Sequence, residues 1–356
     1  MSELPWRFTL EVRRESGDLA ATTQASAAPC IEAAIFRSVW MGELANEGAW
    51  PDLQVTPEWL GDGRPVITGL AVGVAGGTPR HFGLEAFASQ ARALIRSLDA
   101  AGRIGAKERV RWNVAADPAG DPAGLGKVRI SRSPFPLEPA DLPDVAPGSF
   151  GVGFAAEVLA GLHDRVRSTG SVEGAELLLG RLHHDSTRRA VQLSVAEALP
   201  LTPGRGGQSN THFAFDPGSF VAARSAALAR RDGLRPVGWH HNHNPCDACL
   251  ERPDCDANWV FFSEDDQQVQ ATLFPSPYMV ALVGGKIAAL PASRPGFRLY
   301  GWSGGVMEER HFGVTGPGAE AWDRELGAFA DGAPGRPPVG APSPATPEKE
   351  TTCPTN

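Results

Sequence analysis

The chain has 356 residues, 42% of them hydrophobic, which is long and apolar enough for two folded domains. A formal net charge of −8 with no basic cluster argues against nucleic acid as a partner. No apolar run approaches the ~20 residues of a membrane span, and the N-terminal segment lacks the features of a secretory signal. We therefore expect a cytoplasmic protein with no membrane partner.

The first part of the chain predicts a small α/β unit over residues 1–117. Apolar residues from Leu84 to Leu98 recur at helical spacing, and Gly102 can end that helix. Alternating or continuously apolar runs elsewhere favour strands. We expect helices at 31–44 and 84–98, and strands at 6–15, 66–74 and 108–115. The role of this accessory domain is not indicated by any motif, and recruitment of a substrate or partner is a hypothesis.

Residues 118–149 are rich in proline and glycine, which suit neither a helix nor a sheet. They are expected to link two domains, and they allow the first strand of the second domain to start near residue 127. The second domain is predicted over 150–315, and the proline-rich tail 331–356 is predicted to be disordered. We expect helices at 153–168 and 218–231, and strands at 176–183, 190–198, 211–215, 234–241, 258–262, 278–284 and 297–302.

The segment GWHHNH (238–243) contains two histidines that can share a metal ion. His241 and His243 alternate along an expected strand, so their side chains face the same side. Such a pair alone is weak evidence, because histidines also pair by chance. Further along, Ser263 and Asp266 stand in an S-x-x-D pattern at the start of an expected helix, where Ser263 is a natural N-cap. Upstream, Glu173 precedes an apolar strand, and taken alone it would be an exposed carboxylate.

Together these segments resemble the JAMM (MPN-plus, or JAB domain) zinc metalloprotease family. The family pattern is a glutamate a few residues before a G-L-L-L-G-like strand, then G-W-x-H-S-H-P, then S-x-x-D. The matching segments are Glu173 ahead of LLLG (177–180), then 238–243, then 263–266. The resemblance covers about 127–315. It implies an α/β (α+β) fold: an MPN-type domain with a curved mixed sheet flanked by helices, preceded by the smaller α/β accessory domain.

The resemblance also implies a role for each matching residue. His241, His243 and Asp266 would bind a catalytic zinc ion, and Glu173 would be the general base for the attacking water. Ser263 would donate a hydrogen bond to the oxyanion. The implied activity is that of a metallo-isopeptidase that cleaves after the C-terminus of a ubiquitin-like protein, in deconjugation or in precursor processing. Cognate activating and conjugating enzymes would be further partners.

The sequence departs from the family pattern in two places. Asn242 stands where the family has serine, which leaves both histidines in position. The interval between His243 and Ser263 is longer than the family's, and the extra residues form a cysteine-rich insertion at 244–258.

The three cysteines of this insertion, Cys246, Cys249 and Cys255, are spaced as in a small structural zinc site. Zinc prefers four ligands, and only three are local. A cluster of reduced thiols in a loop is the alternative. The fourth ligand stays open among His240, Asp254, Cys30 and a group that the sequence does not identify.

Three other functions compete with deconjugation. A JAMM peptidase that processes a sulfur-carrier protein would have the same sequence pattern. A non-catalytic MPN scaffold would be expected to lack some of the four catalytic residue types, all of which are present here. A zinc deaminase needs H-x-E upstream of P-C-x-x-C, and residues 245–249 satisfy only the second half of that signature.

Overall fold

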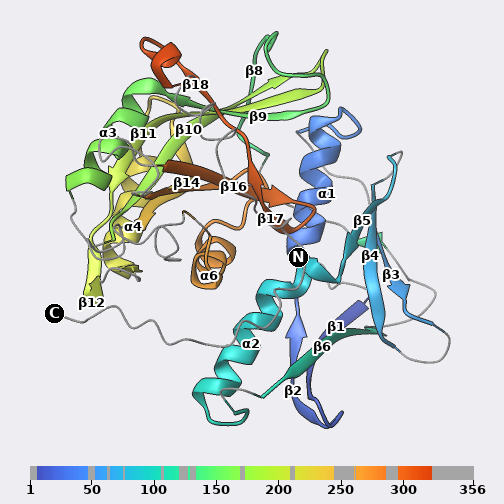
Figure 1. Ribbon diagram of the computed structural model, residues 1–356. Helices are drawn as coiled ribbons and strands as arrows, with labels where there is room; N and C mark the ends of the chain where they lie inside the picture. The colour runs from blue at the N-terminus through green and yellow to red at the C-terminus, as the bar shows by residue number, and fades with distance from the viewer. Residues whose placement is uncertain are drawn as a thin grey trace.

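The protein is described from a computed structural model, in which the N-terminal strands lie beside a larger curved sheet (Figure 1). The structure describes residues 6–46, 53–61, 65–74, 77–105, 108–119, 127–128, 134–168, 173–208, 213–243, 260, 262–285 and 296–322. Within these ranges, no helix is both long and apolar enough to cross a bilayer.

Nine of the described strands form one large mixed sheet. Its order is β17-β16-β15-β14-β10-β11-β9-β18, and β8 pairs with the far end of β10. The pairs β14–β15, β11–β9, β18–β9 and β10–β8 are parallel, and the others are antiparallel. The strands are β8 (Leu137–Pro139), β9 (Phe150–Ala155), β10 (Ala175–Asp185), β11 (Ala190–Pro200), β14 (Arg235–His243), β15 (Val280–Gly285), β16 (Gly296–Ser303), β17 (Val306–Arg310) and β18 (Gly313–Thr315).

Alternation along the strands gives this sheet two apolar faces. Val280 and Leu282 of β15 join the core on one face, where helix α3 (Ala156–Ser168) packs. Ala281 and Val283 join the core on the other face, with α4 (Pro217–Leu228) and α6 (Glu264–Leu273). Since successive side chains of a strand point to opposite faces, a central strand covered on both sides is apolar throughout. β12 (Pro203–Gln208) and β13 (Phe213–Phe215) form a separate antiparallel pair.

The N-terminal residues form two smaller sheets with two α-helices. β1 (Trp6–Arg14) lies between β2 (Leu19–Ala25) and β6 (Val110–Pro118). The second sheet has the order β5-β4-β3-β7, from β5 (Arg80–Gly83), β4 (Ile67–Val74), β3 (Leu53–Trp59) and β7 (Lys127–Val128). The helices are α1 (Ala28–Trp40) and α2 (Ala88–Ala100), the second preceded by the 3-10 turn η1 (Leu84–Phe87).

Aromatic side chains join the N-terminal unit to the large sheet. Phe36 of α1 contacts the rings of Phe135, Phe150 and Tyr278, with centroids 4.9–6.2 Å apart. The Trp40 indole N–H donates to the carbonyl oxygen of Arg189 at 2.5 Å. One apolar core therefore runs from the N-terminal sheets into the α3 face of the large sheet.

A polar contact also joins α2 to α6. The Arg96 guanidinium lies 2.6 Å from the Asp265 carboxylate and also donates to the Gln268 side chain. Arg92 donates to the Gln267 side chain. The first turns of α6 are thus held from outside by the N-terminal unit.

The predicted fold class is confirmed: the protein is α/β, with a curved mixed sheet, flanking helices and a smaller α/β unit before it (Figure 1). A first strand of the second domain near residue 127 is not found among the described residues: Lys127 and Val128 pair with β3, and the first described strand of the large sheet begins at Leu137. The edge of β3 that does not face β4 has unpaired backbone N–H and C=O groups, and the segment 127–128 forms hydrogen bonds with them. The cysteine-rich insertion 244–258 and the tail 331–356 lie outside the described residues.

Smaller differences follow from weak local patterns. The helix expected at 153–168 is strand β9 followed by α3, and the polar segment at 19–25 forms β2. β3 lies between residues 44 and 66, where no helix or strand was expected. Val260 and Phe262, the described residues of the strand expected at 258–262, are not in a strand.

Candidate metal centre

A β-bulge in β14 decides which way the two histidines point. Leu178 and Leu179 of β10 pair with Gly238 and Pro236, which leaves Val237 as an extra residue. Gly238 fits there because a Cβ would overlap the carbonyl oxygen of Val280 on β15. Such an extra residue changes the face to which all later side chains of the strand point. After the bulge, Trp239 belongs to the core on the α6 face.

The start of α6 supplies the third side chain of the site. The Ser263 hydroxyl accepts from the backbone N–H of Asp266 at 3.1 Å, and the Ser263 N–H donates to Asp266 Oδ2 at 2.7 Å. This reciprocal pair is a capping box, which satisfies two helix donors and fixes the Asp266 carboxylate. The structure confirms the expected N-cap role of Ser263.

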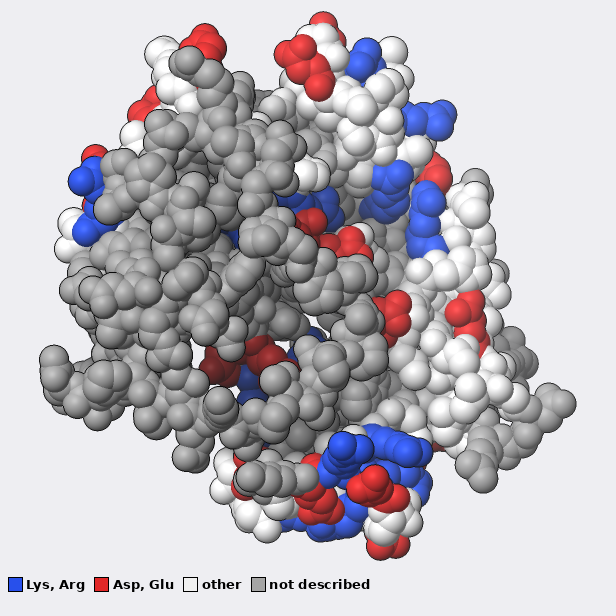
Figure 2. Space-filling view, viewed as in Figure 1, with Lys and Arg blue, Asp and Glu red and all other residues white. Residues whose placement is uncertain are grey.

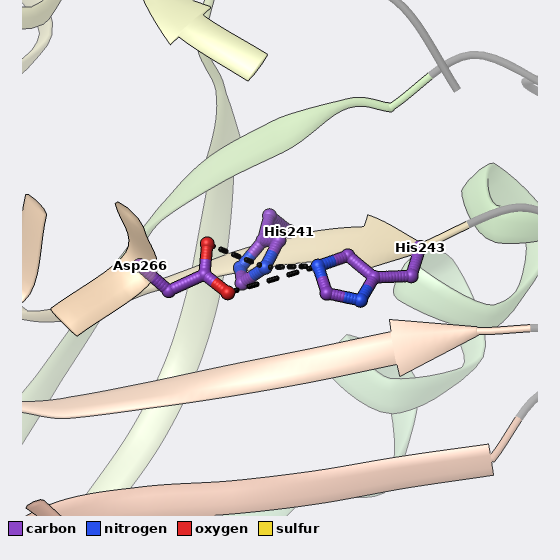
Figure 3. A group of neighbouring side chains, drawn as sticks. All are labelled: His241, His243 and Asp266. Atoms are coloured by element: carbon purple, nitrogen blue, oxygen red, sulfur yellow. Dashed lines mark hydrogen bonds and ion pairs between the residues drawn. The ribbon is translucent and has the colours of Figure 1, made fainter. Parts of the chain in front are cut away.

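His241, His243 and Asp266 converge on one point (Figure 3). The two Nε2 atoms lie 3.0 Å apart. His241 Nε2 lies 3.1 Å from Asp266 Oδ1, and His243 Nε2 lies 3.7 Å from Oδ2. Tetrahedral zinc with ligands at 2.0–2.2 Å requires neighbouring ligand atoms roughly 3.3 Å apart, so these separations fit the ion.

The chemistry of this set of side chains also fits a catalytic ion. Two imidazoles and one carboxylate leave a coordination position open, as in hydrolytic zinc sites, although iron(II) sites use the same set. A buried group of His241, His243 and Asp266 can therefore hold a metal ion.

Burial and mutual electrostatic interactions shift the pKa values of all three side chains. Burial opposes a charge on His241, but Asp266 and the nearby glutamates outweigh it and raise the His241 pKa. Burial and the neighbouring His241 lower the pKa of His243 to about 4. Burial opposes ionisation of Asp266, yet the two histidines and Ser263 hold its pKa below the usual range. The site therefore favours an ionised carboxylate and a neutral His243, the forms that bind metal.

The His241 ring is held by stacking. Trp239 lies against it with centroids 4.4 Å apart and planes 14° apart. The Trp239 N–H donates to Gln270 of α6 at 2.8 Å, in a fully buried contact. His241 Nδ1 is buried and has no hydrogen-bond partner among the described residues. The orientation of the ring thus depends on Trp239, which is itself a core residue.

Glu173 lies at the same site and is almost fully buried, at 4% exposure. Burial raises its pKa to about 7, with His241 lowering it and Asp266 raising it further. The Glu173 carboxylate is therefore close enough to His241 and Asp266 to interact with both electrostatically. The expectation for Glu173 taken alone, an exposed carboxylate, is wrong, because the side chain is buried next to Gly174, which is hydrogen-bonded to Asn242 of β14.

Asn242 fixes the backbone beside Glu173. Its Oδ1 accepts from the Gly174 N–H at 2.8 Å, and its own N–H donates to the Gly174 carbonyl at 3.2 Å. Both bonds extend the β10–β14 pairing by one residue. The residue that departs from the family pattern thus connects the strand of the histidines to the segment of the glutamate.

The opposite face of β14 carries a second buried charged group, which the sequence did not predict. His240 Nδ1 lies 2.5 Å from Glu176 Oε2, and Arg165 of α3 lies 2.7 Å from Glu176 Oε1. Glu176 stands directly across from His240 in the β10–β14 ladder. A cross-strand pair can be found only once the register is known.

Cys246, Cys249 and Cys255 lie outside the described residues, so the predicted structural zinc site stays a prediction. Two candidates for its fourth ligand are occupied elsewhere. His240 is paired with Glu176, and Cys30 is buried in the N-terminal core, where burial raises its thiol pKa to about 12.

Comparison with known proteins adds little. No protein-family model matches this sequence, and no curated protein matches it. Among solved structures, the solution structure of protein DSY2949 from Desulfitobacterium hafniense is 18% identical, over 46% of this chain and 92% of that chain, with a TM-score of 0.30. A likeness at that level supports no assignment, so the function must be argued from the site.

Proposed function

We propose that the protein is a zinc-dependent metallo-isopeptidase of the JAMM type that cleaves after the C-terminus of a ubiquitin-like protein. The observation that supports this most is the convergence of His241, His243 and Asp266 beside a buried glutamate. The ligand set alone is compatible with oxygen chemistry. A buried carboxylate beside the three ligands favours hydrolysis, because it is a group that can accept a proton from a metal-bound water.

Bound zinc would polarise the scissile carbonyl and lower the pKa of water toward about 7. Glu173 takes a proton from the attacking water and gives it to the departing amine, a transfer often worth a factor of 10²–10⁴. The Ser263 oxygen already accepts from Asp266 N–H, so its own hydrogen remains to donate to the developing oxyanion, which contributes roughly 3–4 kcal/mol. Asn242 and Gly174 hold the glutamate segment in place.

The proposal extends to the protein's setting. We place the enzyme in the cytoplasm, with a ubiquitin-like protein or its conjugates as substrate and cognate activating and conjugating enzymes as partners. Processing of a sulfur-carrier precursor would use the same active-site residues, and only the identity of the substrate distinguishes it from cleavage of ubiquitin-like conjugates. A non-catalytic MPN scaffold is disfavoured because all four residue types of the site are present.

Glu173→Gln tests the proposal directly. The variant should keep about one catalytic zinc per chain and lose peptidase activity by a factor of roughly 10²–10⁴, since the amide cannot accept the proton. Activity is measured on a fusion of a ubiquitin-like protein to a fluorescent amine, and metal content by elemental analysis. Glu138→Gln is the matched control, because that glutamate pairs with Arg181 at the surface.

Two outcomes would overturn the proposal. Full activity in Glu173→Gln would show that the base is another group. A purified protein that holds iron rather than zinc at His241, His243 and Asp266 would point to a different reaction.

A further inference from the structure

A cleft of about 470 Å³ lies between the N-terminal unit and the large sheet. We call it the arginine cleft, because Arg37, Arg80 and Arg310 line it. Its walls come from α1 and β5 on one side, and from β9 and the turn between β16 and β17 on the other. None of the described residues that line it is acidic, although the chain as a whole carries a charge of −8. Figure 2 shows basic side chains near the place of α1 in Figure 1, with acidic side chains among them.

Aromatic rings hold two of the guanidinium groups, one from each side of the cleft. The Arg37 guanidinium carbon lies 3.8 Å from the centre of the Trp40 ring. The Arg310 guanidinium carbon lies 5.3 Å from the centre of the Phe150 ring. These two rings are 6.0 Å apart, so the contacts form one continuous row. Stacking orients a guanidinium without using its N–H donors, which stay available for an anion.

The positive charge of the cleft is only partly balanced. Arg80 pairs with Glu43 at 2.8 Å, while Arg37 donates to the Gly148 carbonyl and Arg310 to that of Trp302. A carbonyl oxygen satisfies a donor but carries no net charge. Burial and the neighbouring Arg80 lower the pKa of Arg37, and burial lowers that of Arg310. Like charges gathered in a partly buried cleft cost free energy that a bound anion would recover.

We propose that the arginine cleft binds a small organic anion. Arg37, Arg80 and Arg310 would bind its phosphate or carboxylate oxygens, which the fork of a guanidinium matches in pairs. The apolar part of the anion would lie against Trp40 and Phe150. The volume falls in the range of small-molecule sites, which combine apolar walls with a few convergent polar groups. This site is independent of the proposed peptidase activity.

Binding is tested by calorimetry on the full-length protein with three aromatic probes. Phenyl phosphate and phthalate carry the two kinds of anionic group, and benzyl alcohol is the uncharged control. We expect one of the anions to bind with a dissociation constant on the order of 1 mM or tighter, and the alcohol not to bind. A tighter phenyl phosphate identifies the ligand as a phosphate ester, and a tighter phthalate as a dicarboxylate. Either result supports the proposal.

Substitutions locate the binding to the cleft. Arg37→Gln and Arg80→Gln should each weaken the anion about tenfold or more, since each removes a charge-assisted contact. Arg224→Gln on the exposed side of α4 should leave the affinity unchanged. Arg37→Lys keeps the charge and serves as the second variant if Arg37→Gln does not fold.

Two results would overturn the proposal. One is the absence of saturable binding of either anion up to about 10 mM. The other is binding that the arginine substitutions leave unchanged, which would mean that the three arginines only join the two parts of the molecule. Neither readout depends on peptidase activity, so the outcome is separate from that of Glu173→Gln.

Discussion

The two faces of strand β14 carry neighbouring histidines in opposite electrostatic settings. On one face, His240 is enclosed by Glu176 and Arg165, and acid and base are matched within the protein. On the other face, the nitrogens of His241 and His243 meet the Asp266 carboxylate with no arginine or lysine among the three. The first group is complete in itself, while the second gathers electron-pair donors around a point where a cation fits.

The difference separates a structural group from a metal site on the same strand. Buried charges persist only when they are paired, so the Arg165–Glu176–His240 group needs nothing further. His241, His243 and Asp266 each offer one ligand atom at a single point, so a metal ion can complete this second group once the histidines are neutral. Substitution on each face should therefore give opposite results: lost metal on one, lost stability on the other.

The largest effect is expected from Asp266→Ala. The substitution removes one of three ligands, and we expect zinc affinity to fall by roughly a thousandfold or more. Mutating residues that only hydrogen-bond to metal ligands already lowers metal affinity 10–100-fold, and loss of a ligand itself should cost more. Competition with a fluorescent chelator measures the affinity. Zinc bound as tightly as by the unchanged protein would mean that the ion sits elsewhere.

Glu176→Gln should lower the free energy of unfolding by about 3 kcal/mol, because it leaves His240 and Arg165 without a buried counter-charge. Urea denaturation measures the change, and zinc stoichiometry should stay at one for the catalytic site. Asp232→Asn breaks an exposed pair with Arg230 and is the control, with an unchanged denaturation midpoint. A loss of zinc in Glu176→Gln would show that the two faces are not independent.

The buried glutamate makes metal-free protein sensitive to pH. The pKa of Glu173 is raised from 4.5 to about 7, so folding favours its neutral form. This contribution to stability is fully present below pH 4.5 and is lost as the pH rises through about 7. Between pH 5 and 8 we expect metal-free protein to lose stability on the order of 2 kcal/mol relative to Glu173→Gln. Parallel curves of stability against pH for the two proteins would show that Glu173 ionises normally.

Asn242→Ala is expected to have the smallest of these effects. It removes the acceptor for the Gly174 N–H and loosens the glutamate segment, which should lower kcat roughly tenfold at unchanged zinc content. Steady-state kinetics with the fusion substrate give kcat and KM separately. A change confined to KM would place Asn242 in substrate binding instead.

The sequence predicted the ligand residues because the chemistry is local. His241 and His243 stand two residues apart on a strand, and Ser263 and Asp266 three apart at a helix start, so each pair is close whatever the rest of the fold does. The bulge at Val237 could not be foreseen, since it depends on pairing with β10 and β15. The contacts of Glu176 with His240 and of Asn242 with Gly174 were missed for the same reason, because these partners are fixed by register.

Helix α6 is held from two directions, which bears on how the chain can be dissected. Its buried side meets the large sheet through Gln270, while Arg92 and Arg96 of α2 hold its outer side. A fragment that begins after residue 118 would lack the contacts from α2 to α6. Without Phe36, the rings of Phe135 and Tyr278 would also become more exposed to water. The half that carries the metal ligands is therefore not a transferable module. Because α6 carries the ligand Asp266, a change in the α2 side chains that hold α6 would alter the position of that ligand.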